Sequence, residues 1–246
     1  MIMRFLHKFS SPPYFYWLSG KMLPWLTLLF IALLAYGLYG GLVLAPADYQ
    51  QGDSFRIIYI HVPSAWMSLF VYMVMAISGA IGLVWHIKLA EIVSISSAGI
   101  GAAFTFIALV TGSLWGKPMW GTWWVWDARL TSELILLFLY LGVIGLYGAI
   151  EDKRTAARAV AILALVGVVN IPIIHYSVEW WNTLHQGATV TKFDKPSMHP
   201  DMLIPLLVMA VAFKVYYAIA LLMRCRNEVL QREQNNRWVD EILEKL

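Results

Sequence analysis

Six long apolar stretches divide this 246-residue sequence, and they constrain its fold more than any other feature. A helix needs about 20 mostly apolar residues to cross the hydrocarbon core of a bilayer, and each stretch has about that length. The stretches are Leu23–Leu44, Val62–Trp85, Ile92–Ser113, Leu130–Ile150, Ala156–Tyr176 and Leu203–Met223. We therefore predict an all-α integral membrane protein. Its six spans form a single domain over residues 1–246, which ends in a polar tail at residues 224–246.

The overall composition favours a membrane protein over a soluble one. Hydrophobic residues make up 60% of the chain and charged residues 13%, whereas a soluble domain has about 45–50% and about 25%. A net charge of +3 is too small to indicate a nucleic-acid partner. The single cysteine, Cys225, excludes an internal disulfide, a cysteine-based zinc site and a C-x-x-C-H haem attachment site.

The distribution of basic residues predicts the orientation. Six spans place both termini on one side, and twelve of the eighteen Lys and Arg residues fall in segments on that side. Five fall in the three outer segments, and Lys214 lies within the last span. The positive-inside rule therefore predicts that both termini are cytoplasmic. A charge as deep in the membrane as that of Lys214 is costly. Two interpretations are open: Lys214 pairs with a small partner subunit, or its side chain extends to the membrane interface.

The outer segment 114–129 is unusually rich in tryptophan. It holds five of the twelve tryptophans of the chain: Trp115, Trp120, Trp123, Trp124 and Trp126. One interpretation is an aromatic belt at the membrane interface. The other is a flat apolar platform for a large planar ligand. The platform is favoured because all five rings lie in one connection, whose backbone we expect Gly116, Pro118 and Gly121 to shape.

Charged residues flank this tryptophan segment. Asp127 precedes a predicted helix, so an N-cap role is expected. Arg129 can pair with Asp127 or meet a ligand carboxylate with two hydrogen bonds, and Glu133, one turn later, can neutralise it. Arg56 is the only basic residue of the first outer segment and is either an exposed charge or a second carboxylate partner.

Two outer histidines stand out. His61 begins the second span, where Pro63 suits the first helical turn. His185 follows the fifth span, in a segment from Trp180 that we expect to form a short amphipathic helix on the membrane. Each can instead be an ordinary interfacial or loop histidine. Imidazoles ligate haem iron, aromatic rings pack on the macrocycle, and arginines meet propionates, so the set as a whole favours a haem site.

A third outer histidine, His175, is expected to have a structural role. Pro172 should kink the fifth span and free a backbone carbonyl. We expect His175 to satisfy that carbonyl or to bond to a neighbouring helix.

The sequence W-G-K-P-M-W-G-T-W-W-V-W-D-A-R-L-T-S resembles the WWD signature of the CcmC family of haem-handling proteins in cytochrome c maturation. The flanking sequences R-I-I-Y-I-H-V-P and H-Y-S-V-E-W-W-N-T-L-H-Q-G are also similar to that family. The resemblance covers nearly the whole chain, including the number of spans and the length.

This resemblance implies a haem site at the periplasmic face of a bacterial inner membrane. The haem would be b-type, bound non-covalently and transiently, with His61 and His185 as axial ligands of its iron. Arg56 and Arg129 are the candidate propionate partners. The residues that would contact or frame the haem are Trp115, Trp120, Trp123, Trp124, Trp126 and Asp127.

The resemblance also implies partners. The haem would pass to the chaperone CcmE, within an assembly that includes the ABC transporter subunits CcmA and CcmB and the small membrane protein CcmD. This chain has no nucleotide-binding motif, so ATP chemistry has to come from a partner, and a templating role in haem attachment is expected rather than enzymatic catalysis. Two alternatives remain: a membrane b-type cytochrome with permanent haem, and a passive scaffold or permease subunit without haem.

Overall fold

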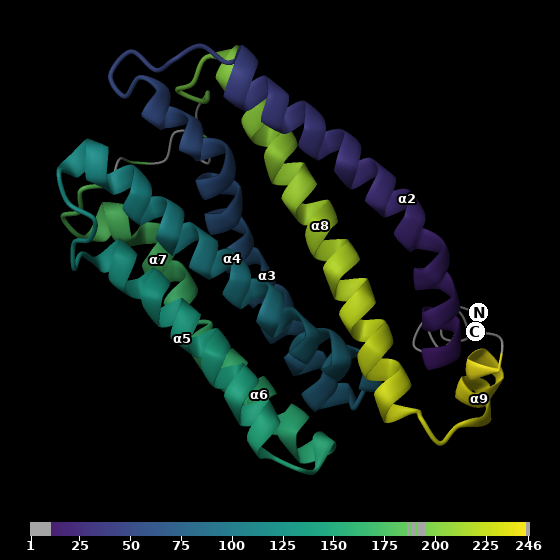
Figure 1. The fold of residues 1–246 in the computed structure, drawn as a ribbon. Coiled ribbons are helices and arrows are strands. Elements are labelled where there is room, and N and C mark those ends of the chain that lie inside the picture. Colours follow the sequence, from purple (N-terminus) through teal and green to yellow (C-terminus); the bar gives the residue numbers. More distant parts are fainter. Residues whose placement is uncertain (1–10, 186, 188–189, 191–194, 245–246) are drawn as a thin grey trace.

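The computed structural model describes residues 11–185, 187, 190 and 195–244 (Figure 1). Four basic residues used for the orientation, Arg4, Lys8, Lys192 and Lys245, lie outside the described residues. The described part of the chain contains helices and no strand. In chain order the elements are α2 (Pro12–Tyr39), the π-helix η1 (Gly40–Leu44), the 3₁₀ helix η2 (Asp53–Ile57), α3 (Ile58–Trp85), α4 (Lys88–Trp120), α5 (Ala128–Ala149), α6 (Lys153–Gly167), α7 (Asn170–Trp180), α8 (Pro200–Arg232) and α9 (Arg237–Leu243).

Six helical stretches of the described chain are long and apolar enough to cross a membrane. This confirms the predicted all-α, six-span fold class. The stretches are Pro12–Leu44, Asp53–Trp85, Lys88–Trp120, Ala128–Ala149, Lys153–Trp180 and Pro200–Arg232. Several helices extend well beyond the predicted apolar runs, because helical hydrogen bonding continues into the polar and aromatic residues at the span ends.

The helices form an elongated bundle in which α2 lies against α8, α3 and α4 lie in the middle, and α5, α6 and α7 cover the other side (Figure 1). The central core lies between α3, α4, α5, α6, α7 and α8 and includes the fully buried side chains of Tyr72, Met75 and Tyr140. The start of α2 and helix α9 lie at the same end of the bundle (Figure 1).

Small residues set the distance between some of these helices. A methyl group added to Gly101 on α4 would lie 2.1 Å from Cζ of Tyr140 on α5, so only glycine fits there. A methyl group at Gly79 on α3 would lie 3.2 Å from the Cα atom of Ala161 on α6. Such close approach is typical of helices packed in membranes. At Gly145 an added methyl group would meet nothing within 4 Å.

The fifth span is broken between α6 and α7. Pro172 has no N–H to offer the carbonyl of Val168, so that carbonyl accepts a hydrogen bond from the N–H of Ile171 instead (3.0 Å). The buried amide Nδ2 of Asn170 donates to the backbone carbonyl of Ser132 on α5 (2.9 Å). The predicted disruption by proline is therefore confirmed, but the freed carbonyl is satisfied by the backbone rather than by a histidine.

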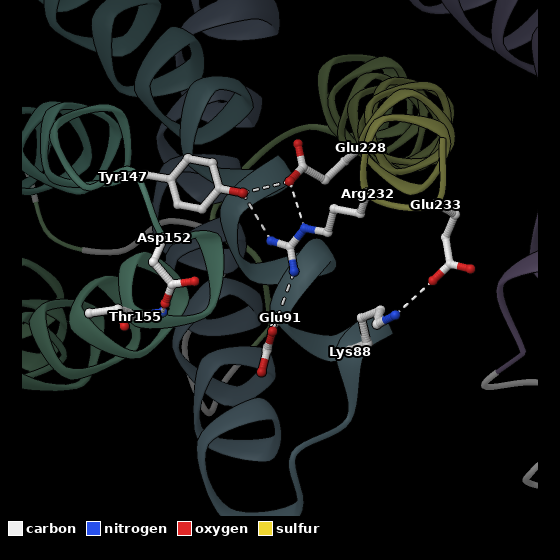
Figure 2. Close-up of polar contacts among 8 residues, drawn as sticks. All are labelled: Lys88, Glu91, Tyr147, Asp152, Thr155, Glu228, Arg232 and Glu233. Atoms are coloured by element: carbon white, nitrogen blue, oxygen red, sulfur yellow. Dashed lines mark hydrogen bonds and ion pairs between the residues drawn. The ribbon is translucent and has the colours of Figure 1, made fainter. Parts of the chain in front are cut away.

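Helix α8 continues past the predicted end of its span at Met223, as far as Arg232. A polar network holds this extension (Figure 2). The Arg232 guanidinium donates to Oε1 of Glu228 (2.8 Å), to Oε2 of Glu91 on α4 (3.3 Å) and to the hydroxyl of Tyr147 on α5 (2.9 Å). The Tyr147 hydroxyl in turn donates to Glu228 (2.5 Å). The first part of the expected polar tail is therefore packed helix.

Lys214 lies near the middle of α8 and is exposed on the bundle surface. Its Nζ atom is 5.8 Å from the centroid of the Phe70 ring on α3. This is within the range of a cation–π contact.

Candidate functional site

A cavity lies where α3 and α5 begin and α4 ends. These helix ends lie at the end of the bundle opposite to the start of α2 (Figure 1). Its volume is about 320 Å³, which is at the lower end of the range for small-molecule sites. The walls come from α3, α4, α5, α7, the segment that follows α7, Leu206 of α8 and Gln51 before η2. Six of the ten residues expected to contact haem or its iron line it: His61, Trp115, Trp120, Trp124, Arg129 and His185.

His61 enters the cavity from the first turns of α3. Its Nδ1 atom is 3.0 Å from the hydroxyl of Thr111 on α4. That hydroxyl has one proton, which it donates to the carbonyl of Ile107 (2.6 Å), so it accepts from the Nδ1–H of His61. The neutral ring then keeps its lone pair on Nε2, as a metal-ligating histidine requires. The His61 ring also packs edge-on against Trp115, with ring centroids 5.6 Å apart.

His185 reaches the same cavity from the segment after α7. Its Nδ1 atom lies 3.8 Å from Oδ2 of Asp127, an ion-pair contact longer than a hydrogen bond. Its ring packs on Trp120 at a centroid distance of 4.8 Å.

The helix expected from Trp180 to His185 is a wrong prediction. Helix α7 ends at Trp180, and the chain continues without helical structure. The N–H of His185 donates to the hydroxyl of Thr183 (2.9 Å), a local side-chain bond of the kind that competes with helix formation.

Asp127 links the fold to the site. Its Oδ1 atom accepts the N–H of Leu130 (2.8 Å), so the predicted N-cap of α5 is confirmed. Its Oδ2 atom faces His185. Burial favours a higher pKa for the Asp127 carboxyl, but the nearby imidazole of His185 and the N–H of Leu130 outweigh it and lower the pKa to about 2. A carboxylate in this place orients the His185 ring through Nδ1 and leaves Nε2 available.

The tryptophan segment is partly helical, which corrects the expected loop at residues 114–129. Helix α4 continues to Trp120 and includes Gly116 and Pro118. It ends at Gly121, whose left-handed backbone (φ 76°) lets its N–H bond to the carbonyl of Lys117 (3.1 Å). Two of the five tryptophans therefore stand on a rigid helix.

The five tryptophans divide into two groups. Trp115, Trp120 and Trp124 line the cavity. Trp123 and Trp126 lie outside its lining and are 54% and 76% exposed. The segment therefore offers one group of rings to the cavity and another to the surface.

The two candidate arginines are placed differently. Arg129 lines the cavity, and its Nη1 atom donates to the carbonyl of Ile174 on α7 (3.3 Å). Arg56 lies outside the cavity lining, where it bonds to Asp53 (2.9 Å) and to the carbonyl of Gly41 (2.9 Å). The cavity therefore gains one of the two expected guanidinium groups.

Several residues at the cavity were not assigned to the site from the sequence. Thr111 holds His61, and Gln51 accepts a hydrogen bond from Nε1 of Trp115 (2.9 Å). Their partners are 50 and 64 positions away, so no local pattern marks them. His175, expected to be structural, lies exposed at the cavity wall together with Glu179.

Comparison with known proteins gives the family. The CcmC family model, described as Heme exporter protein C, matches residues 5–240. This chain belongs to the CcmC family. It is 55% identical over 240 residues to Heme exporter protein C of Escherichia coli (strain K12), in an alignment that covers 98% of this chain and 97% of the relative. It is 51% identical over 243 residues to Heme exporter protein C of Haemophilus influenzae, in an alignment that covers 99% of both chains.

A more distant relative of this CcmC-family chain is found in a plant. This chain is 46% identical over 198 residues to a putative cytochrome c biosynthesis ccmC-like mitochondrial protein of Marchantia polymorpha. The alignment covers 80% of this chain and 84% of the relative. Family membership and six apolar helices make this chain a multi-pass membrane protein of a haem-handling family in cytochrome c maturation.

Proposed function

We propose that this chain holds haem in the cavity, with Nε2 of His61 and of His185 as axial ligands, and passes it to the chaperone CcmE. The observation that carries the proposal is the pairing of both imidazoles at one cavity. In each ring Nδ1 faces an oxygen atom, of Thr111 or of Asp127. Haem here is a cargo rather than a resident cofactor.

Unsatisfied polar atoms at the cavity support a ligand. Among the described residues, a small set of buried side-chain polar atoms has no hydrogen-bond partner, and three of them belong to this site: Trp124 Nε1, Asp127 Oδ2 and His185 Nδ1. Burying such atoms unpaired is costly. Asp127 Oδ2 and His185 Nδ1 face each other at 3.8 Å, so a small shift of the His185 ring as it binds iron would pair them, and Trp124 Nε1 is left as a donor for the ligand.

The remaining cavity residues suit the rest of the macrocycle. The rings of Trp115, Trp120 and Trp124 offer apolar surface to the porphyrin, and Arg129 offers hydrogen-bond donors to a propionate. Cys225, the only cysteine of the chain, is buried in another cluster with Ile92 and Val229. A thioether bond to the porphyrin is therefore excluded, which favours non-covalent, b-type binding.

The proposal places the cavity on the periplasmic side of the inner membrane. Basic residues are in excess in the terminal segments and in the connections on the same side, which supports a cytoplasmic location of that side. The cavity lies at the other end of the bundle. The ATP-driven subunits CcmA and CcmB, with CcmD, would complete the assembly.

The axial assignment is tested on purified protein loaded with haem. The wild-type protein should show a low-spin spectrum, and His61→Ala or His185→Ala should each lose haem or shift the spectrum to high spin. His175→Ala is the matched control, because His175 lines the same cavity without being a proposed ligand. Unchanged haem content and spectrum in both axial variants would rule out the assignment.

The delivery step is tested by adding CcmE to the loaded protein. Haem should leave the cavity and appear on the chaperone. Reversible electron transfer with haem retained throughout would support the alternative of a membrane b-type cytochrome.

A further inference from the structure

Glu133 is a carboxylate buried in a membrane-spanning helix. It lies on α5, in the span Ala128–Ala149, and only 9% of the residue is exposed. An acidic residue within a span is costly and usually has a functional reason. The N-cap, axial and propionate roles described above do not use it.

The surroundings of Glu133 place it at the cavity and hold it in position. It lines the cavity from α5. Its Oε1 atom is 2.7 Å from the hydroxyl of Ser68 on α3. The same hydroxyl is 2.8 Å from the carbonyl of Ala65, so Ser68 has a second acceptor.

Glu133 and Arg129 act on each other electrostatically. They are four residues apart on α5, so their side chains share a face of the helix. Arg129 has several donors, and its hydrogen bond within the described chain goes to the carbonyl of Ile174. The carboxylates of Glu133 and Asp127 attract the Arg129 guanidinium electrostatically. No described carboxylate lies within 4.0 Å of the Arg129 guanidinium.

We propose that the Glu133 carboxylate competes with the carboxylates of bound haem for the Arg129 guanidinium, and so shortens the time for which the cavity retains haem. This rests on the proposed haem site. Arg129 attracts a propionate, while Glu133, one turn deeper, attracts the same guanidinium and repels the propionate. A cavity that passes its cargo on needs such an opposing charge, because a site optimised only for attraction releases slowly.

The test measures haem loss from loaded protein to excess apomyoglobin. Glu133→Gln keeps the shape of the side chain and can donate to or accept from Ser68, whose second acceptor remains. Removing the negative charge that shares the Arg129 guanidinium should lengthen haem retention about tenfold, the order of magnitude of one charge–charge interaction near a protein surface. Unchanged or faster loss from the variant would overturn the proposal. A wild-type protein that takes up no haem with a low-spin spectrum would instead overturn the proposed function.

Two further arms identify the mechanism. Haem dimethyl ester lacks both carboxylates, so its rate of loss should be the same from wild type and from Glu133→Gln. In an Arg129→Gln background the effect of Glu133→Gln on haem should shrink, since the contested guanidinium is gone. An equal effect with the ester, or an undiminished effect in the Arg129→Gln background, would contradict competition for Arg129.

Glu179→Gln is the matched control. Glu179 lines the same cavity from α7 but is exposed, so its charge is screened by water and salt. Its removal should change haem retention less than twofold. A tenfold effect there would show that any cavity carboxylate has the same influence, and the specific role of Glu133 would be wrong.

Discussion

The two carboxylate oxygens of Asp127 have different partners, so their contributions can be separated. Oδ1 caps α5 through the N–H of Leu130, and Oδ2 faces Nδ1 of His185. Asp127→Asn keeps an oxygen for the cap but removes the charge near His185. Asp127→Ala removes both.

The expected magnitudes differ for stability and for haem binding. Loss of an N-cap costs about 1 kcal/mol, and asparagine caps almost as well as aspartate. Asp127→Ala should therefore lower the free energy of unfolding by about 1 kcal/mol, and Asp127→Asn should change it little. Loss of a carboxylate that orients a metal-ligating histidine lowers affinity by about 10-fold to 100-fold, or about 1.4 to 2.7 kcal/mol. Both variants should show that loss.

The assay combines thermal unfolding in detergent with haem titration followed by absorbance. Asp152 supplies the matched control, because it caps α6 with the same geometry, Oδ1 accepting the N–H of Thr155 at 2.8 Å. Asp152→Ala should destabilise the protein without changing its haem affinity. If Asp127→Asn binds haem as tightly as wild type, the carboxylate does not act through His185 and the reasoning is refuted.

Three further predictions follow from burial and charge. Folding lowers the pKa of Asp127 from 3.8 to about 2. The ionised Asp127 therefore stabilises the folded protein fully above about pH 4, and this stabilisation is lost as the pH falls towards 2. The free energy of unfolding of Asp127→Asn should accordingly depend less on pH in that window than that of the wild type. Trp120→Ala should lower haem affinity about fivefold, since this ring lines the cavity, whereas Trp126→Ala, at a side chain outside the lining, should change it less than twofold in the same titration. Arg232→Met should destabilise the protein by about 2 kcal/mol, because the partly buried carboxylates of Glu91 and Glu228 lose their guanidinium donor. Arg237→Met, at a side chain that is 93% exposed, should leave the unfolding temperature unchanged.

The span count was predictable from the sequence because bilayer thickness fixes the length of an apolar run. The helix ends were not, because polar residues extend a helix when distant partners satisfy them. Helix α8 reaches Arg232 since that guanidinium bonds to Glu91 and Tyr147 on other helices. Such contacts join residues 141 and 85 positions apart, and no local pattern reveals them.

The candidate site was predictable in its chemistry but not in its geometry. The motif indicated His61 and His185, and both line one cavity. Arg56 was expected on equal terms with Arg129, but it lies outside the lining because Asp53 and a backbone carbonyl bind its guanidinium. The sequence alone could not distinguish the two arginines, since each is an isolated basic residue in an outer segment.

The break in the fifth span divides that crossing into two mechanical parts. Helix α6 packs in the central core through Val160 and Ala164. Helix α7 contributes Ile174 to the same core and is also tied to α5 by the amide of Asn170 and by the Arg129–Ile174 bond. The half of the crossing that lines the cavity is therefore fixed to α5, the helix that carries Arg129 and Glu133, so one crossing supplies both an anchor in the bundle and a wall of the cavity.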